Sequence, residues 1–195
     1  MDLSFLKGTR IIALDIETTC LSIQKAFVRE LGAAEFIDGK YVRGSSALFS
    51  GGRSDPGALK CHKITDESVA GKPTFMEKAG AFSNFLSAGG KRPADILGHN
   101  VQKYDIPIIK RFVYGAGYKM AGNGPNGDLR IIDTLVICRT RFQFASNRLE
   151  DLCKMFGIKH GGHRALGDVK CNWELFLKLV ELMDCTNYED LITSD

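Results

Sequence analysis

Thr-Arg-Ile-Ile-Ala-Leu-Asp-Ile-Glu, residues 9–17, is the stretch that decides the fold of this chain. Its apolar residues occupy both alternating faces, which is typical of a central strand in a sheet that is covered on both sides. Asp15 and Glu17 interrupt the run at its end and, being two residues apart, project from the same face. Burying two like charges together is unfavourable, so the pair predicts a bound Mg²⁺ or Mn²⁺. The alternative is that the strand simply ends in solvent.

Strand and helix signals follow in an order that defines the fold class. Strand-like runs at 27–37 and 41–49 flank Asp38-Gly39, which is a hairpin signal, and residues 50–57 are predicted to form a loop. Further strands are predicted at 94–97 and 129–132, with a flexible glycine-rich loop at 115–128 between them. Helices are predicted to begin at Pro73-Thr74, to cover 106–114, to follow Asp133 as a cap, and to cover 148–156 and 165–183. This order predicts a single domain over residues 1–195, an α/β fold with a mixed sheet flanked by helices.

The composition excludes several classes of protein. The chain has 195 residues, 44% hydrophobic and 25% charged, which is ordinary for a globular domain and argues against disordered or fibrous classes. A net charge of +3 permits nucleic-acid binding without requiring it. No run reaches the ~18 apolar residues of a membrane span. The spacing of the six cysteines suits neither a zinc site nor a disulfide framework, so buried reduced thiols and a cytoplasmic location are expected.

Two further acidic residues are candidates for the same site as Asp15 and Glu17. Asp105 precedes an apolar helical run with Pro107 close behind, which is also a good position for a helix N-cap. Asp168 is expected in the first turn of the helix from 165, where its alternative role is to stabilise the helix dipole. Strand ends and helix starts gather at one edge of such a sheet, and this predicts that the carboxylates meet.

His163 is the candidate general base. It stands five residues before Asp168 and follows Gly161-Gly162, so it is expected in a loop over the same edge of the sheet. A histidine with an ordinary pKa near 6.5 can accept a proton from water at neutral pH. The alternative is a surface histidine without a role, and His160 is a competitor three residues away.

Three ordered motifs resemble one known family, the DEDDh exonucleases of the DnaQ-like group, which have the ribonuclease-H-like fold. The motifs are Leu-Asp-Ile-Glu-Thr-Thr at 14–19, His-Asn-Val-Gln-Lys-Tyr-Asp at 99–105 and His-Arg-Ala-Leu-Gly-Asp at 163–168. Weaker matches lie at 61–65, 132–135 and 149–158, so the resemblance covers nearly the whole chain. The departures from the family pattern are Cys20 and Lys63, which stand where glycine is common, and one extra residue between Asn100 and Asp105.

The resemblance implies a five-stranded sheet and a two-metal 3′→5′ exonuclease. Asp15 would bridge two Mg²⁺ or Mn²⁺ ions, and Glu17 and Asp168 would hold the one that binds the attacking water. Asp105 would support the second ion, and His163 would take the proton from that water.

The resemblance also implies residues that contact the substrate, the 3′ end of a single-stranded nucleic acid. Thr18 and Thr19 would hold the terminal nucleotide, and Asn100 and His62 are candidates for polar contacts. Tyr104 offers an aromatic face for a base, although packing is an equally good explanation. The apolar wedge candidates are Leu21 and Ile64, and Arg164 is among the basic residues that could contact phosphates.

The sequence leaves the substrate and the partners open. We favour DNA, because the chain is longer than a minimal RNA-trimming module and the loop at 115–128 could border an extended strand. An exoribonuclease is the alternative within the same chemistry, and a hydrolase of a nucleotide conjugate is another. An inactive binding module is the alternative of another class. A polymerase or replication protein is the candidate partner, no membrane association is expected, and the oligomeric state is undetermined.

Overall fold

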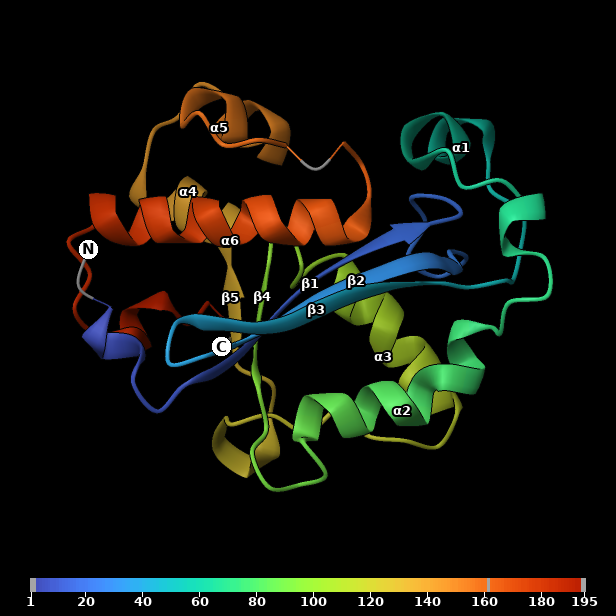
Figure 1. Cartoon of the computed structure of the whole chain (residues 1–195), viewed down its shortest axis with the longest axis horizontal. Coiled ribbons are helices and arrows are strands. Elements are labelled where there is room, and N and C mark those ends of the chain that lie inside the picture. Colours follow the sequence, from blue (N-terminus) through green and yellow to red (C-terminus); the bar gives the residue numbers. More distant parts are fainter. Residues whose placement is uncertain (1–2, 161, 194–195) are drawn as a thin grey trace.

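The computed structural model describes residues 3–160 and 162–193, which form a five-stranded sheet between two layers of helices (Figure 1). The strands are β1 Arg10–Thr18, β2 Val28–Ile37, β3 Lys40–Leu48, β4 Asp95–Gly98 and β5 Ile131–Asp133. The α-helices are α1 Pro56–His62, α2 Phe75–Ser87, α3 Asp105–Gly115, α4 Thr134–Arg141, α5 Leu149–Met155 and α6 Ala165–Leu182. Short 3-10 segments are Ser4–Leu6, Glu67–Val69, Pro125–Gly127 and Tyr188–Leu191.

The sheet is mixed, and β1 lies at its centre. The strand order is β3-β2-β1-β4-β5, with β1 antiparallel to β2 and parallel to β4, and with β4 parallel to β5. The carboxyl ends of β1, β4 and β5 therefore lie at the same edge of the sheet. The predicted α/β class, mixed sheet and central strand are confirmed.

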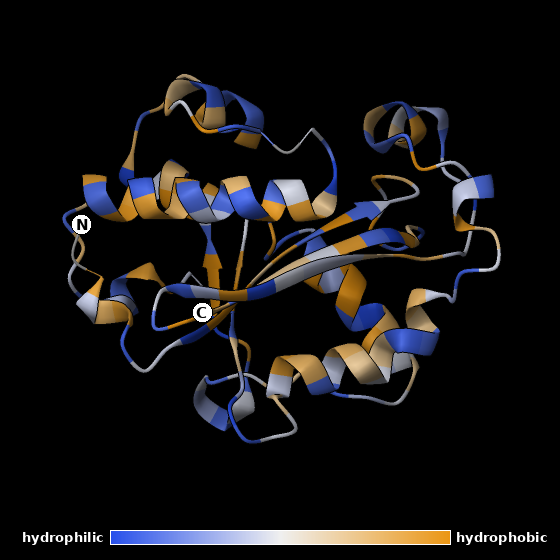
Figure 2. Cartoon of the chain, viewed as in Figure 1, coloured by the Kyte–Doolittle hydropathy of each residue, from blue (hydrophilic) through white to orange (hydrophobic). Residues whose placement is uncertain are grey.

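Alternate residues of β1 enter two separate cores. Ile12 and Leu14 pack with residues of α2 and α3, whereas Ile11 and Ala13 pack with residues of α6. Figure 1 shows α6, α4 and α5 on one side of the sheet, opposite α2 and α3, and Figure 2 shows how hydrophobic the central strands are. An apolar run on both faces is thus explained by helices on both faces.

Local sequence signals set most element boundaries. Asp38 and Gly39 both have positive φ values, 53° and 74°, as the predicted tight hairpin between β2 and β3 requires. Thr74 is the N-cap of α2 and forms a reciprocal capping box with Glu77. Asp133 caps α4, because its side chain accepts the N–H of Leu135 at 3.0 Å.

Two predictions from the sequence are wrong. The loop predicted at 50–57 ends early, because Pro56 begins α1 at its first position and Asp55 caps the helix by accepting the N–H of Ala58 at 2.7 Å. The six cysteines are all free thiols, as expected, but Cys61 on this helix is exposed, so not all of them are buried. The loop at 115–128 also contains a 3-10 turn at its end.

Gly32 on β2 allows α6 to begin against the sheet. A Cβ at this position would lie 2.3 Å from the carbonyl carbon of Ala165 and 2.4 Å from the nitrogen of Leu166. Gly32 pairs with Asp15 across the β1–β2 ladder, so the first turn of α6 lies next to the acidic end of β1. Among the helices in the described ranges, none is both long enough and apolar enough to cross a membrane.

We expect Gly32→Ala to destabilise the protein, because the new methyl group meets backbone atoms that cannot rotate away. Overpacking of this kind costs about 1–3 kcal/mol. Urea denaturation of both proteins measures the change in the free energy of unfolding. The matched control is Gly57→Ala in α1, where the nearest atom to a new Cβ is a side-chain oxygen of Asp55 at 3.4 Å. Equal stability of the Gly32 variant and the wild type would contradict the packing described here.

Candidate active site

Three carboxylates meet where β1 ends and α6 begins. Asp15 and Glu17 lie on β1, and Asp168 lies in the first turn of α6. One carboxylate oxygen from each lies within 4.8 Å of those of the other two. Asp168 is buried, while Asp15 and Glu17 are partly exposed. The predicted meeting of these three residues is confirmed, and their oxygens are spaced closely enough to share a cation.

Asp105 approaches the same strand end from the opposite layer of helices. It is the first residue of α3, and its Oδ1 accepts the backbone N–H of Ile16 at 3.0 Å. The alternative role as an N-cap is wrong, because the N-cap residue is Tyr104 and no side chain caps this helix. The extra residue before Asp105 is accommodated in a turn in which Asn100 has a positive φ of 64°. Asp105 thus adds a fourth acid that is anchored to β1.

The electrostatics of this group favour a cation. The pKa of Glu17 is raised to about 8, first by burial and then by Asp168, Glu30 and Asp105. Burial also raises the pKa of Asp15, and the charges of Asp105, Glu17 and Asp168 raise it further. Burial raises the pKa of Asp105 to about 8, against the hydrogen bond from Ile16. A bound cation would stabilise the ionised carboxylates and offset both their burial and the repulsion among Asp15, Glu17 and Asp168.

Glu30 and Arg164 hold the start of α6 in place. Arg164 donates Nε–H and Nη2–H to the two carboxylate oxygens of Glu30, at 3.0 and 3.1 Å, and the N–H of Ala165 donates to Glu30 Oε2 at 3.3 Å. Glu30 is 1% exposed and pairs with Glu17 across the ladder. Burial alone would raise the pKa of Glu30, but Arg164 and its other hydrogen bonds keep it below the usual value. A carboxylate from β2 therefore serves as the cap of α6.

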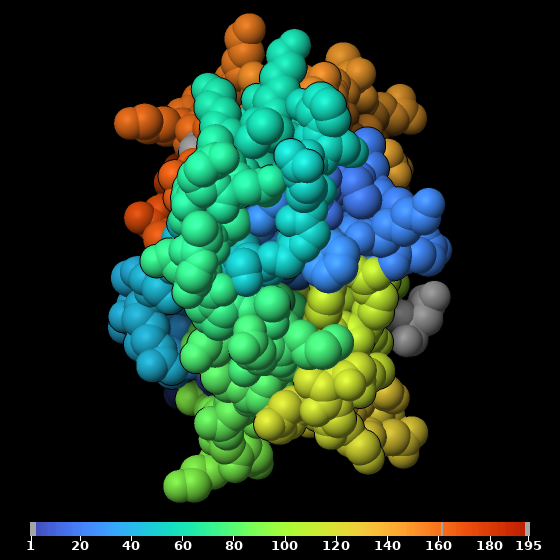
Figure 3. Space-filling view, turned by 90° about the vertical axis from the view of Figure 1, so that its right-hand side faces the viewer, coloured from blue at the N-terminus to red at the C-terminus, as the bar shows by residue number. Residues whose placement is uncertain are grey.

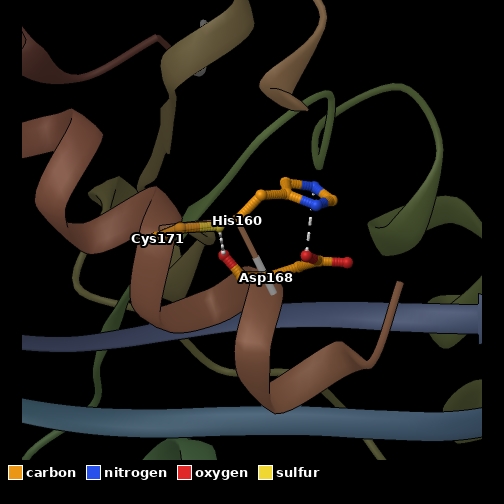
Figure 4. Close-up of side chains that lie close together, drawn as sticks. All are labelled: His160, Asp168 and Cys171. Carbon is orange, nitrogen blue, oxygen red and sulfur yellow. Dashed lines mark hydrogen bonds and ion pairs between the residues drawn. The ribbon is translucent and has the colours of Figure 1, made fainter. Parts of the chain in front are cut away.

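His160 contacts Asp168, and His163 lies beside His160. The Nε2 atom of His160 lies 3.3 Å from Asp168 Oδ1, as Figure 4 shows. His163 has a positive φ of 58° and its ring lies 5.2 Å from that of His160, edge to face. His163 therefore sits in the loop before α6, as expected, but of the two histidines it is the competitor His160 whose ring contacts Asp168 in the described structure.

Thr18, Thr19 and Tyr104 form a hydrogen-bonded turn after β1. The hydroxyls of Thr18 and Tyr104 are 2.6 Å apart, and Tyr104 also donates to the carbonyl of Cys20 at 2.9 Å. Thr19 donates its N–H to the carbonyl of Phe27, and its Oγ1 accepts the N–H of Phe27, both at 2.9 Å. These bonds tie the start of α3 to the turn and hold it in one conformation.

The remaining substrate-contact candidates differ in exposure. Leu21 is 86% exposed at the tip of the turn after β1, whereas Ile64 and His62 are buried. The Nδ1 atom of His62 accepts the N–H of Ile64 at 2.9 Å, which fixes the backbone after α1. Lys63, between them, has a positive φ of 60° at the C-cap of α1. This explains why glycine is common there in the family that the motif resembles.

Arg29 attaches the segment that carries His62 to the sheet. Its guanidinium is buried and binds Asp66, the carbonyl of Gly52 and the hydroxyl of Ser54. Figure 3 shows this segment, coloured teal and green, along one side of the molecule beside the blue connection between β1 and β2. The N–H of Asp55 donates to the carbonyl of Thr19 at 2.8 Å, so the two segments are in direct contact.

Asn100 lies at the end of β4, at the same edge of the sheet. Its N–H donates to Asp133 Oδ1 at 2.8 Å, and the preceding His99 contacts Thr134 and the carbonyl of Asn147. Asp133 is thus a structural carboxylate that orders the turn leading to Asp105.

Sequence reasoning missed Glu30 as a partner of the site and treated Arg164 as a phosphate contact. The available signal was a charged pair, Arg29-Glu30, inside the otherwise apolar strand at 27–37. Buried charges in a strand require partners. Their identities were not readable, because Arg164 is 134 residues away from Glu30 in the sequence.

The exonuclease family profile matches residues 12–176 of the chain. The chain is 30% identical over 181 residues to DNA polymerase III subunit epsilon of Haemophilus influenzae, covering 87% of this chain and 67% of that protein. It is 31% identical over 194 residues to the same subunit of Buchnera aphidicola subsp. Acyrthosiphon pisum, covering 95% of this chain and 76% of the relative.

The solved structure of Escherichia coli exonuclease I in complex with single-stranded DNA has a similar fold. The TM-score is 0.76 with 19% sequence identity, over 91% of this chain. This chain spans 41% of the exonuclease I chain. The ribonuclease-H-like fold expected from the motifs is confirmed by this similarity.

We expect the metal-free protein to lose stability as the pH rises between about 4.5 and 8. The carboxyl groups of Glu17 and Asp15 have raised pKa values in the folded state and ordinary values near 4 in the unfolded chain. In this window the folded protein therefore binds more protons than the unfolded chain, so the free energy of unfolding falls with rising pH. Urea denaturation in chelator at several pH values measures the slope.

Glu17→Gln should make this slope shallower, and added Mg²⁺ should restore stability at the upper end of the window. The control is Glu181→Gln, which changes an exposed carboxylate paired with Lys178. A wild-type slope that is flat or rises with pH would show that these carboxyl groups are not held in a protonated state.

Proposed function

Because this chain belongs to the exonuclease family, we propose that it is a metal-dependent 3′→5′ exonuclease that releases nucleoside monophosphates from single-stranded DNA. The observation that carries the proposal is the group of Asp15, Glu17 and Asp168, whose ligand oxygens lie within 4.8 Å of one another. The same three residues and His163 stand in the motifs that resemble the DEDDh pattern. A binding module without activity would not need this repulsive group.

The donor set suits hard divalent cations, and we infer two Mg²⁺ or Mn²⁺ ions. All donors are carboxylate oxygens, which hard divalent cations prefer. Burial raises the pKa values of Asp15 and Glu17, and the neighbouring carboxylates raise them further, a repulsion that cations would relieve. Asp15, Glu17 and Asp168 would hold the ions directly, with Asp105 as the fourth acid. Bound ions supply a nucleophile from water at neutral pH and stabilise the charge that develops on the phosphate.

The residues of the chain supply the position of the reactants and the transfer of the proton. His163 accepts the proton of the attacking water from its place in the loop before α6. The bidentate contact between Glu30 and Arg164 holds this loop, and with it the first turn of α6, against β2. The positive charge of Arg164 also lowers the pKa of Glu17 and so favours its ionised form.

The 3′-terminal nucleotide binds at the turn after β1. Thr18 and Thr19 shape this turn, and the exposed side chain of Leu21 contacts the terminal base from its tip. Tyr104 lies at the same turn and provides an aromatic surface, while Asn100 and the segment of His62 and Ile64 border the site. Stacking of one base on an aromatic side chain contributes ~1–3 kcal/mol.

DNA is the proposed substrate, and a DNA polymerase is the proposed partner. The similar proteins of Haemophilus influenzae and Buchnera aphidicola are named as subunits of DNA polymerase III, and the similar exonuclease I was solved with single-stranded DNA. An exoribonuclease would use the same carboxylates, so matched DNA and RNA substrates distinguish the two.

We expect a ladder of products that shortens from the 3′ end of 5′-labelled single-stranded DNA. The ladder requires Mg²⁺ or Mn²⁺ and disappears in chelator, because the carboxylates alone repel the phosphate. Asp15→Asn keeps the size of the side chain and removes its charge, and should abolish cleavage while the circular dichroism spectrum is unchanged. RNA of matched sequence is run beside the DNA.

Three outcomes would revise the proposal. If RNA is cleaved faster than DNA, RNA is the substrate. Full activity of Asp15→Asn would exclude the metal assignment. If the wild type binds DNA tightly but does not cleave it with either metal ion, the binding module is favoured.

We expect His163→Ala to lower kcat by ~10²–10⁴-fold, the usual contribution of a general base, with partial recovery at high pH where hydroxide replaces it. The matched control is His160→Ala, which removes the same ring three residues earlier and should cause a smaller loss. Single-turnover rates over a range of pH measure both. A larger loss in the His160 variant would assign the base to His160.

A further inference from the structure

A second group of possible ligands lies beside the carboxylates, and it contains nitrogen and sulfur as well as oxygen. His160, Asp168 and Cys171 place Nε2 or Nδ1, a carboxylate oxygen and Sγ within 4.8 Å of one another (Figure 4). His160 comes from the loop before α6, whereas Asp168 and Cys171 are three residues apart on the same face of the first two turns of α6.

The distance between the nitrogen and the oxygen of this group fits a tetrahedral ion. An ion with bonds of roughly 2.0–2.1 Å to nitrogen and oxygen places these two atoms about 3.3 Å apart. The observed distance between His160 Nε2 and Asp168 Oδ1 is 3.3 Å. The Sγ atom of Cys171 lies within 4.8 Å of the ligand atoms of His160 and Asp168, and its thiol donates to the backbone carbonyl of Asp168 at 3.2 Å.

The chemistry of the donors differs from that of the carboxylate group. Mg²⁺ seldom takes thiolate or imidazole ligands, whereas Zn²⁺ and Co²⁺ take both readily. A second sulfur is close, because the side chains of Cys153 on α5 and Cys171 are hydrogen-bonded to each other. Both thiols are buried, and the side chain of His160 is 19% exposed, so the imidazole is the most solvent-accessible ligand of the group.

We propose that His160, Asp168 and Cys171 form a site for a thiophilic divalent cation such as Zn²⁺. Asp168 belongs to both this site and the carboxylate group. An ion held by His160 and Cys171 therefore draws Asp168 away from the magnesium ligands, and it inhibits cleavage. The inhibition rests on the proposed exonuclease function, whereas the binding of the ion does not.

Binding is tested with Co²⁺ as a spectroscopic probe on the metal-free full chain. A thiolate ligand gives an intense near-ultraviolet charge-transfer band, which oxygen ligands do not give. We expect this band in the wild type and its loss in Cys171→Ala. The matched control is Cys138→Ala, which removes an equally buried thiol from α4 and should retain the band.

Competition with Zn²⁺ measures the affinity of the site. Zn²⁺ should displace Co²⁺ from the wild type. The Kd for Zn²⁺ should rise in His160→Gln by more than the ~10–100-fold that loss of an outer-shell partner causes. This change lies at a partly exposed residue and keeps the chain folded. His160→Gln thus tests the site even if Cys171→Ala fails to fold. A missing band in the wild type, or a band that persists without the Cys171 thiol, would overturn the site.

Inhibition is tested by the ratio of cleavage rates with and without Zn²⁺, at constant excess Mg²⁺. The ratio should be low for the wild type and Cys138→Ala, and close to one for Cys171→Ala. Equal inhibition of all three proteins would overturn the shared role of Asp168. If no cleavage is found at all, the exonuclease proposal fails, and the cobalt band still decides whether the ion site exists.

Discussion

The packing of the first turn of α6 on Gly32 is the contact on which the site depends. Because Gly32 has no side chain, the backbone of Ala165 and Leu166 lies directly on β2, opposite Asp15 in the strand ladder. Asp168 follows within the same turn and so reaches the end of β1. The helix that covers one face of the sheet is therefore also the element that completes the acidic group.

The same contact brings several carboxylates close together, and only some of them are paired with a positively charged side chain. Glu30 is buried, and its charge is matched by the two-pronged contact with Arg164 and by the N–H of Ala165. Asp15 and Glu17 have no hydrogen-bonded cation among the described contacts, and burial together with the neighbouring carboxylates raises their pKa values, which the more distant charge of Arg164 only partly offsets at Glu17. The pKa of Glu30 is lowered. One face of the strand pair thus contains a satisfied carboxylate for structure and unsatisfied ones suited to metal binding.

Asp168 lies between two chemical environments. On the β1 side its neighbours are carboxylates, which suit hard cations, and on the loop and α5 side they are His160 and thiols, which suit softer ones. Because Asp168 is shared by the carboxylate group and by the group of His160 and Cys171, an ion bound to the second group would change the ability of the first to bind Mg²⁺. The link follows from helical spacing, because Asp168 and Cys171 are neighbours on one face of α6.

The sequence by itself determined the central strand, the hairpin at Asp38-Gly39 and the start of the helix at Thr74, because these follow from periodicity and turn residues. Motif spacing also indicated Asp15, Glu17 and Asp168 as one acidic group. The sequence missed α1, and it left Asp105 open between a cap and a site residue. Only the tertiary structure decided that Asp105 binds the N–H of Ile16, that Glu30 holds Arg164, and that His160 contacts Asp168. These contacts join residues brought together by strand pairing and by the close approach of α6 to Gly32, and such distances cannot be read from local sequence patterns.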